Sequence, residues 1–161
     1  MLAPRGAKNI TPLTTVVALN NNLASSIAAA TGESYDVDIA KSGGVSPKTL
    51  RLAKGIETFM HVFARSESNL LTSVEDQVRA LTYLADRLSV ANLVDSTSIE
   101  NAVKTAVSDT ISGITSLSSL TTASKSSLKN DVASTSKKAM DAITSTASTI
   151  TEESILSAVS N

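Results

Sequence analysis

The chain has 161 residues and a formal net charge of −1, with no cysteine, no tryptophan and only 2% aromatic residues. A chain of this length suits one domain that can bury its own core. The lack of cysteine excludes disulfides, thiolate metal ligands and a cysteine nucleophile. Nucleic-acid-binding domains are typically basic, with clustered lysines and arginines, and the net charge of this chain is near zero. We therefore expect no nucleic-acid partner.

The side chains available for a core and a surface are unusual. Hydrophobic residues make up 42% of the chain, and with so few aromatics the core must consist mainly of Ala, Val, Ile and Leu. Serine and threonine number 26 and 19, while charged residues reach only 18%, below the roughly 25% of an average domain. We therefore predict closely packed helices with a hydroxyl-rich, lightly charged surface.

The first ten residues have no apolar pattern, and a helix start follows them. We predict that residues 1–10 connect an upstream domain to a helical domain at 11–161. Thr11 can cap a helix, and Pro12 fits its first turn. Apolar residues at helical spacing predict one helix over Pro12–Thr31, with Gly32 as its left-handed stop. Asn20 interrupts this apolar stripe and needs a hydrogen-bond partner if it is buried.

The same run raises the question of a membrane span, because Asn9–Gly32 contains no charged residue. About 20 apolar residues cross a bilayer. The consecutive amides of Asn20–Asn22 would be costly in hydrocarbon, and the threonines and serines around them lower the hydropathy further. We therefore expect this helix not to span a membrane.

Residues 33–46 form the longest irregular segment, which we expect Tyr35, Val37 and Ile39 to anchor. Long loops within compact domains are often functional. The carboxylates of Glu33, Asp36 and Asp38 offer oxygen ligands of the kind that calcium prefers, but they lack the glycine and distant glutamate of an EF-hand loop. The sequence therefore favours solvated carboxylates over a metal site, and we predict no metal ligands.

The next helix has the clearest start in the chain, with Ser46 as cap and Pro47 as the first helical residue. It is apolar almost all round and contains both phenylalanines, so we expect it to be central. His61, the only histidine, lies on the flank of its apolar stripe. A hydrogen-bonded boundary role is favoured over a metal, haem or general-base role. Met60 is expected to fill the core rather than to ligate a haem.

Three more helices follow. Thr72 with Glu75 and Thr97 with Glu100 have the spacing of capping boxes, and each precedes a run of helical periodicity. From about Ser116 the chain becomes rich in serine and threonine. There we predict a long, weakly amphipathic helix to about Ile150 and a short last turn after Thr151, a half less stable than the rest because hydroxyl side chains compete for backbone hydrogen bonds.

The stretch Ile10–Val17, with its TPLTT motif, resembles the helix start that follows a β-sandwich or carboxypeptidase-regulatory-like module in bacterial secreted lipoproteins and surface proteins. Ser46–Pro47 and the helix after it look like the second segment of such proteins, so the resemblance covers about the first 65 residues. It implies a cell-envelope or extracellular setting and no catalytic residue. This chain itself shows no signal sequence, lipobox cysteine or sandwich.

The sequence therefore predicts an all-α antiparallel bundle of about five helices. We expect a non-enzymatic structural or partner-binding module of a bacterial envelope or secreted protein, with no cofactor and an unidentified protein partner. The alternative is a small-ligand-binding bundle whose site lies where the 33–46 loop meets His61. An enzyme is disfavoured because one histidine and no cysteine leave few catalytic groups. The predicted core consists of Leu50, Ile56, Met60, Phe63, Leu81, Leu84 and Val107.

Overall fold

Helices account for nearly all of the regular structure in the computed structural model, which describes residues 1–40, 44–64 and 70–143. No β-strand occurs in these ranges. The helices are α1 (Pro12–Leu19), α2 (Leu23–Thr31), α3 (Pro47–Phe59), the π-helical turn η1 (Met60–Ala64), α4 (Val74–Ser89), α5 (Ser96–Gly113), the 3-10 turn η3 (Thr115–Leu117) and α6 (Thr122–Asp141).

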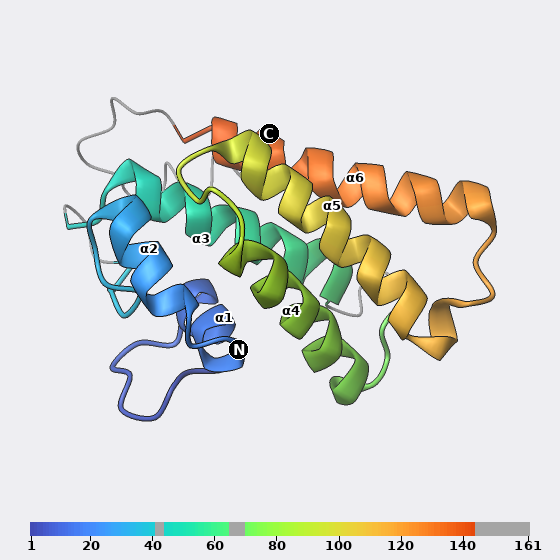
Figure 1. Ribbon diagram of the computed structural model, residues 1–161, viewed down its shortest axis with the longest axis horizontal. Coiled ribbons are helices and arrows are strands. Elements are labelled where there is room, and N and C mark those ends of the chain that lie inside the picture. The colour runs from blue at the N-terminus through green and yellow to red at the C-terminus, as the bar shows by residue number, and fades with distance from the viewer. Residues whose placement is uncertain (41–43, 65–69, 144–161) are drawn as a thin grey trace.

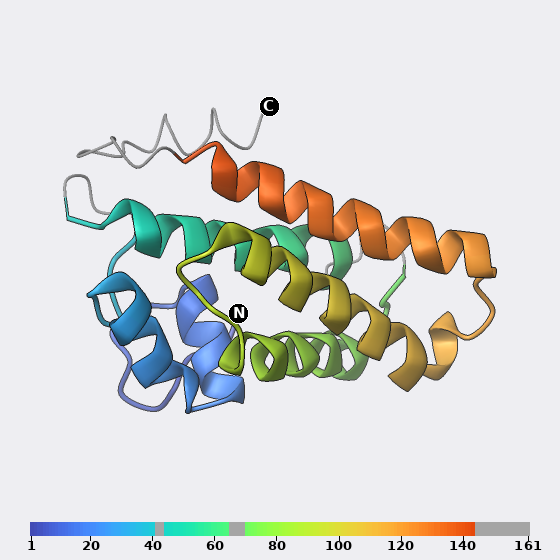
Figure 2. The ribbon, with the colours of Figure 1, turned by 45° about the horizontal axis from the view of Figure 1, so that its top comes forward.

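Successive long helices run in opposite directions, which confirms the predicted all-α antiparallel bundle (Figures 1 and 2). α5 packs against α4 on one side and α6 on the other, and α6 also packs against α3. The pair α1 and α2 contacts both α3 and α4. This arrangement puts the start of α1 beside the end of α3, where the site described below is found.

α3 is central, as its apolar circumference predicted. Most of its residues are buried, and the rings of Phe59 and Phe63 meet edge to face with centroids 5.2 Å apart. Of the predicted core residues, Met60 is only partly buried. The others are buried: Leu50, Ile56, Phe63, Leu81, Leu84 and Val107.

The prediction of one helix over Pro12–Thr31 is wrong, because the chain breaks between α1 and α2. Asn20 ends α1 in an extended conformation, and its side-chain oxygen accepts a hydrogen bond from the N–H of Asn22. Its amide also donates to Asp86 on α4 at 3.0 Å. These bonds to the asparagine side chain compete with continued helix. The predicted ends are both confirmed, since Thr11 and Thr14 form a capping box and Gly32 has a φ of 77°.

Two predicted caps are displaced by one or two residues. Ser73 rather than Thr72 caps α4, and its side chain accepts from the N–H of Asp76. Asp95 rather than Thr97 caps α5, accepting from the N–H of Thr97 itself. Each segment contains several adjacent residues that can cap, so local sequence does not select among them.

The serine- and threonine-rich part begins with η3 instead of a continuous helix from Ser116. α6 starts after Thr121, whose side chain accepts from the N–H of Ser124, and it ends at Asp141. The predicted continuation to Ile150 and the last turn after Thr151 lie outside the described residues. α6 nevertheless buries a face against α3 and α5 through Val132, Ala133, Ser136 and Met140.

Ser136 is the weak point of that buried face. Its hydroxyl is fully buried and has no hydrogen-bond partner among the described residues. Replacing it by alanine removes an unpaired polar group and improves helix propensity. We expect Ser136→Ala to stabilise the protein by about 1 kcal/mol in urea unfolding.

A matched control for this prediction is Thr110→Val on α5, because the buried Thr110 hydroxyl already donates to the carbonyl of Ala106 at 2.7 Å. This exchange should not stabilise the protein. Equal stabilisation by both variants would mean that any buried hydroxyl is unfavourable here, and that Ser136 is not special.

Candidate functional site

A cavity of about 390 Å³ opens beside the end of α3, between residues 1–10, here called the leader, η1 and α4. The leader and α1 contribute one wall, the 33–40 segment a second, and the two helices α3 and α4 the others. It is lined by Met1, Asn9, Ile10, Thr11, Pro12, Ile39, Ala40, Glu57, Met60, His61, Gln77 and Leu81.

The helix wall of this cavity contains the π-helical turn that extends α3. Met60 and His61 belong to this turn, and both line the cavity. Short π-helical segments are rare and frequently occur at functional sites. Met60 is half-buried, whereas His61 is exposed and its imidazole makes no hydrogen bond within the described part of the chain. His61 is therefore more exposed than the boundary position that the sequence predicted.

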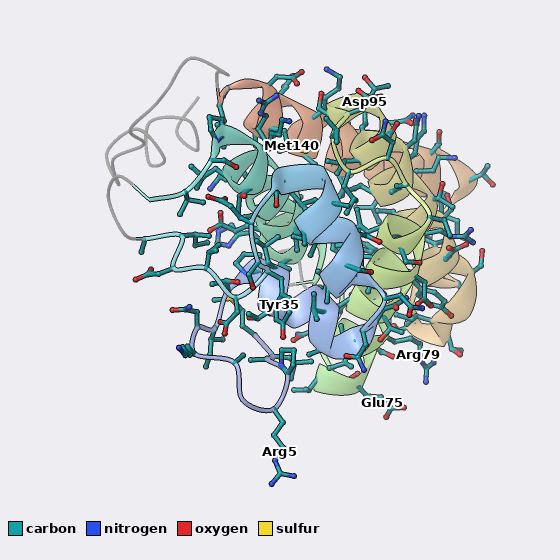
Figure 3. The ribbon with its side chains drawn as sticks, turned by 60° about the vertical axis from the view of Figure 1, so that its left-hand side comes forward. Arg5, Tyr35, Glu75, Arg79, Asp95 and Met140 are labelled. Atoms are coloured by element: carbon teal, nitrogen blue, oxygen red, sulfur yellow. The ribbon has the colours of Figure 1, made fainter. Side chains whose placement is uncertain are left out.

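The leader wall is held at its first residues by two buried threonines of α1. The N–H of Leu2 donates to the hydroxyl of Thr15 at 3.1 Å, and the Leu2 carbonyl accepts from Thr14 and Thr15. Gly6 lies at a turn with a φ of 91°, a conformation that side-chain-bearing residues rarely adopt. Arg5, beside it, extends away from the helices (Figure 3). The leader is thus a loop that returns to the domain.

A second clamp holds the end of the leader. The carboxylate of Asp36 accepts hydrogen bonds from the backbone N–H groups of Lys8 at 2.8 Å and Asn9 at 2.9 Å. The hydrogen bond from Lys8 is the main cause that lowers the pKa of Asp36 below its usual 3.8, with those from Asn9 adding to it and partial desolvation opposing it. This carboxylate, which the sequence suggested as a solvated group, joins two chain segments.

The clamp should depend on pH. Because the folded pKa of Asp36 is lowered, its stabilising contribution is complete well above pH 3.8 and is lost as the pH falls through the folded pKa. We expect the amide proton resonances of Lys8 and Asn9 to titrate together below pH 3.8 in nuclear magnetic resonance spectra. Asp36→Asn should abolish this titration and shift both resonances at neutral pH.

Asp38→Asn is the matched control, because within the described residues the Asp38 carboxylate accepts a hydrogen bond from the nearby N–H of Ala40 and none from the leader. It should leave the amide titration of Lys8 and Asn9 unchanged. If Asp36→Asn leaves that titration intact, Asp36 is not the group that holds the leader.

The three loop carboxylates do not converge. Glu33 accepts hydrogen bonds from the N–H of Ser46 at 3.1 Å and from the hydroxyl of Thr49, at the start of α3. The dipole of α3 also stabilises a negative charge at this end of the helix. Asp36 and Asp38 bond elsewhere. In the ranges that the structure describes, no three His, Cys, Asp or Glu side chains lie close enough together to hold a metal ion.

The polar side chains in the cavity are partly occupied by other groups. One oxygen of Glu57 pairs with the buried ammonium of Lys54 at 2.6 Å. The amide nitrogen of Gln77 donates to the carbonyl of Leu71 at 2.9 Å, and the hydroxyl of Thr11 accepts from the N–H of Thr14. The cavity is thus an apolar concavity with a few fixed polar groups, the usual make-up of a binding site.

The sequence hypothesis placed a ligand where the 33–46 loop meets His61, and the structure brings Ile39, Ala40 and His61 to the same cavity. The loop carboxylates are not among its lining residues. Sequence reasoning missed Gln77 and Leu81 on α4 as well as the leader, because no local pattern indicates which distant elements will meet.

A second surface hollow, of about 490 Å³, lies at Tyr83, Arg87, Asp109 and Gly113 on α4 and α5. The Arg87 guanidinium donates to Asp109 at 2.6 Å, and this hydrogen bond and charge raise the pKa of Arg87. The hollow's main charged groups therefore satisfy each other, and we regard the His61 cavity as the better candidate.

No family model, curated protein or solved structure matches this chain. The resemblance of Ile10–Val17 to secreted lipoproteins therefore stays a prediction. Of the helices that the structure describes, none is both long and apolar enough to cross a bilayer.

Proposed function

We propose that this protein is a non-enzymatic helical binding module of a bacterial cell-envelope or secreted protein, and that the His61 cavity is where it binds its protein partner. The observation that carries the proposal is the apolar rim of this cavity. Met1 and Ile10 line it with 69% and 67% of their surfaces exposed. Val74, also 74% exposed, lies on the same face of α4 as the lining residues Gln77 and Leu81. Exposed apolar side chains around a concavity are typical of interaction sites.

The extracytoplasmic setting has separate support. It comes from the TPLTT resemblance and from the hydroxyl-rich, weakly charged composition without cysteine. The gene that encodes the full protein should carry an export signal, and the protein should fractionate with the envelope or the medium. Cytoplasmic fractionation would contradict this part of the proposal.

The groups around the cavity support the non-enzymatic part of the proposal. His61 is exposed, and the one lining carboxylate, Glu57, is paired with Lys54. A catalytic site needs a base held within reach of a nucleophile or an acid. The lining residues of this cavity do not provide such a pair.

The partner-binding proposal can be tested by photocrosslinking. A photoreactive amino acid at Val62, next to His61 and 37% exposed, should crosslink one envelope protein that mass spectrometry identifies. The purified partner should then bind the wild-type protein, and Ile10→Asp should weaken this binding at least about tenfold, as the loss of an apolar anchor predicts.

Val90→Asp is the matched control, since Val90 is 82% exposed but lies roughly 20 Å farther along α4 than Gln77. It should leave binding unchanged. If both aspartate variants bind equally well, the cavity rim is not the interface.

A second function, binding of a small ligand, is favoured by the size of the cavity. Its volume of about 390 Å³ falls in the range of about 300–1,000 Å³ typical of small-molecule sites. Its mixture of apolar walls and a few polar groups supports the same function. Small molecules that bind there should raise the melting temperature with increasing concentration.

A further inference from the structure

The hydrogen bonds already made around the cavity determine which ligand groups its side chains can still accept. The amide nitrogen of Asn9 donates to the backbone carbonyl of Asp36 at 3.1 Å and to its carboxylate at 3.2 Å. An amide has two N–H donors, so both are used, and the oxygen of Asn9 is the atom that retains hydrogen-bonding capacity.

Gln77 and Glu57 also offer acceptors, and Gln77 keeps one N–H donor, unused by any described residue, beside its oxygen. The amide nitrogen of Gln77 donates to Leu71, while its carbonyl oxygen receives no hydrogen bond from any described residue. The Oε2 atom of Glu57 accepts from Lys54, whereas Oε1 has no donor in the described ranges. The Glu57 side chain is 51% exposed, so this oxygen remains open to solvent. Three lining side chains from the leader, α3 and α4 thus offer acceptors.

The rest of the lining suits an aliphatic body. The side chains of Ile10 and Ile39 come from the two loop walls, and Leu81 comes from α4. Pro12 and Met60 add further apolar surface. Burying the apolar surface of a ligand against these side chains favours binding.

We infer that the cavity binds a small amphiphilic ammonium compound, with its alkyl chain against these apolar walls and its donor head at Glu57, Gln77 and Asn9. An ammonium group has three donors and no acceptor, which matches the unused oxygens. Glu57 adds a charge-assisted hydrogen bond. This inference rests on the small-ligand function proposed above and names its ligand class.

The lining also contains a hydrogen-bond donor for an anionic ligand, the imidazole N–H of His61. A carboxylate amphiphile would pair with that group instead. A set of three probes with the same alkyl chain therefore tests the inference: n-octylammonium chloride, sodium octanoate and octanol, each titrated below its micelle concentration into the full chain by calorimetry.

Octylammonium should bind at one site, at least about tenfold more tightly than octanol, as one charge-assisted hydrogen bond predicts. Octanoate should bind no better than octanol. The amide resonances of His61 and Gln77 should shift during the octylammonium titration. Equal or tighter binding of octanoate, or equal binding of octanol, would overturn the inference while leaving small-ligand binding intact. Absence of binding by all three probes would contradict both, and the crosslinking experiment would still test the partner site.

Variants distinguish recognition of the ammonium group from nonspecific apolar binding of the alkyl chain. Glu57→Gln should weaken octylammonium binding about tenfold and leave octanol binding unchanged. Glu75→Gln is the matched control, because Glu75 pairs with Arg79 on the outer face of α4, outside the cavity (Figure 3). It should change neither affinity.

Because Glu57→Gln leaves the buried Lys54 without its carboxylate, a second variant protects the test against misfolding. Ile10→Lys adds a cation at an exposed rim position without disturbing the core. It should weaken octylammonium binding and strengthen octanoate binding. If neither variant changes the preference between the two ions, the acceptors do not select the ligand.

Discussion

Replacing Phe59 by alanine should lower the free energy of unfolding by about 3–5 kcal/mol, a large share of the roughly 5–15 kcal/mol of a typical domain. Phe59 is fully buried at the end of α3, where its ring meets that of Phe63 edge to face. The neighbouring ring of Phe63 is itself fully buried, so loss of the Phe59 ring leaves a cavity beside it. Urea unfolding followed by circular dichroism measures the change.

Val62→Ala provides the comparison within the same turn, because Val62 is 37% exposed. Its effect should stay within about 0.5 kcal/mol, as for most surface substitutions. A loss for Phe59→Ala no larger than that for Val62→Ala would contradict the central position of the aromatic pair.

Replacing Gly55 by leucine should lower stability by about 1–3 kcal/mol, even though leucine is the better helix former. α3 and α6 approach closely at this glycine, where an added Cβ would lie 2.7 Å from the sulfur of Met140 and 3.5 Å from Ile99. The methionine can move aside for one carbon, but a leucine side chain also needs the volume that Met140 and Ile99 occupy. The melting temperature should fall accordingly.

Two further variants test this explanation. Gly44→Leu should be nearly neutral, since no atom of the described residues lies within 4 Å of a Cβ there. Met140→Ala should make room for the leucine, so the double variant Gly55→Leu with Met140→Ala should be more stable than the sum of the single effects by at least about 1 kcal/mol. Additive losses would show that Gly55 and Met140 do not compete for space.

The candidate site illustrates how far sequence reasoning reaches. The segment at 33–46 is long and lacks a regular pattern, which predicted a ligand site there. Ile39 and Ala40 of this segment do line the cavity with His61. The contributions of Gln77 and Ile10 required the fold. Both residues follow ordinary local patterns, one as a helix-surface amide and one before a helix cap.

The hydrogen-bond partners of the loop carboxylates were also not predictable from the sequence. Glu33 and Asp36 read in sequence as loop residues free to bind water or calcium. In the structure Glu33 accepts hydrogen bonds at the start of α3, and Asp36 accepts them from the end of the leader. The bonding residues are 13 and 28 positions away, a separation that no local motif reports.

By itself, the sequence determined the helices and many of their ends, because apolar periodicity, the Thr11 and Ser46 caps and the φ of Gly32 are properties of neighbouring residues. Only the tertiary structure decided where the first helix breaks, where the leader returns and which helices enclose the cavity. At the break, Asn20 bonds to distant Asp86 as well as to nearby Asn22, and the leader bonds to Asp36 and to the threonines of α1. These outcomes depend on hydrogen bonds between distant segments, and such bonds form only after the helices have packed.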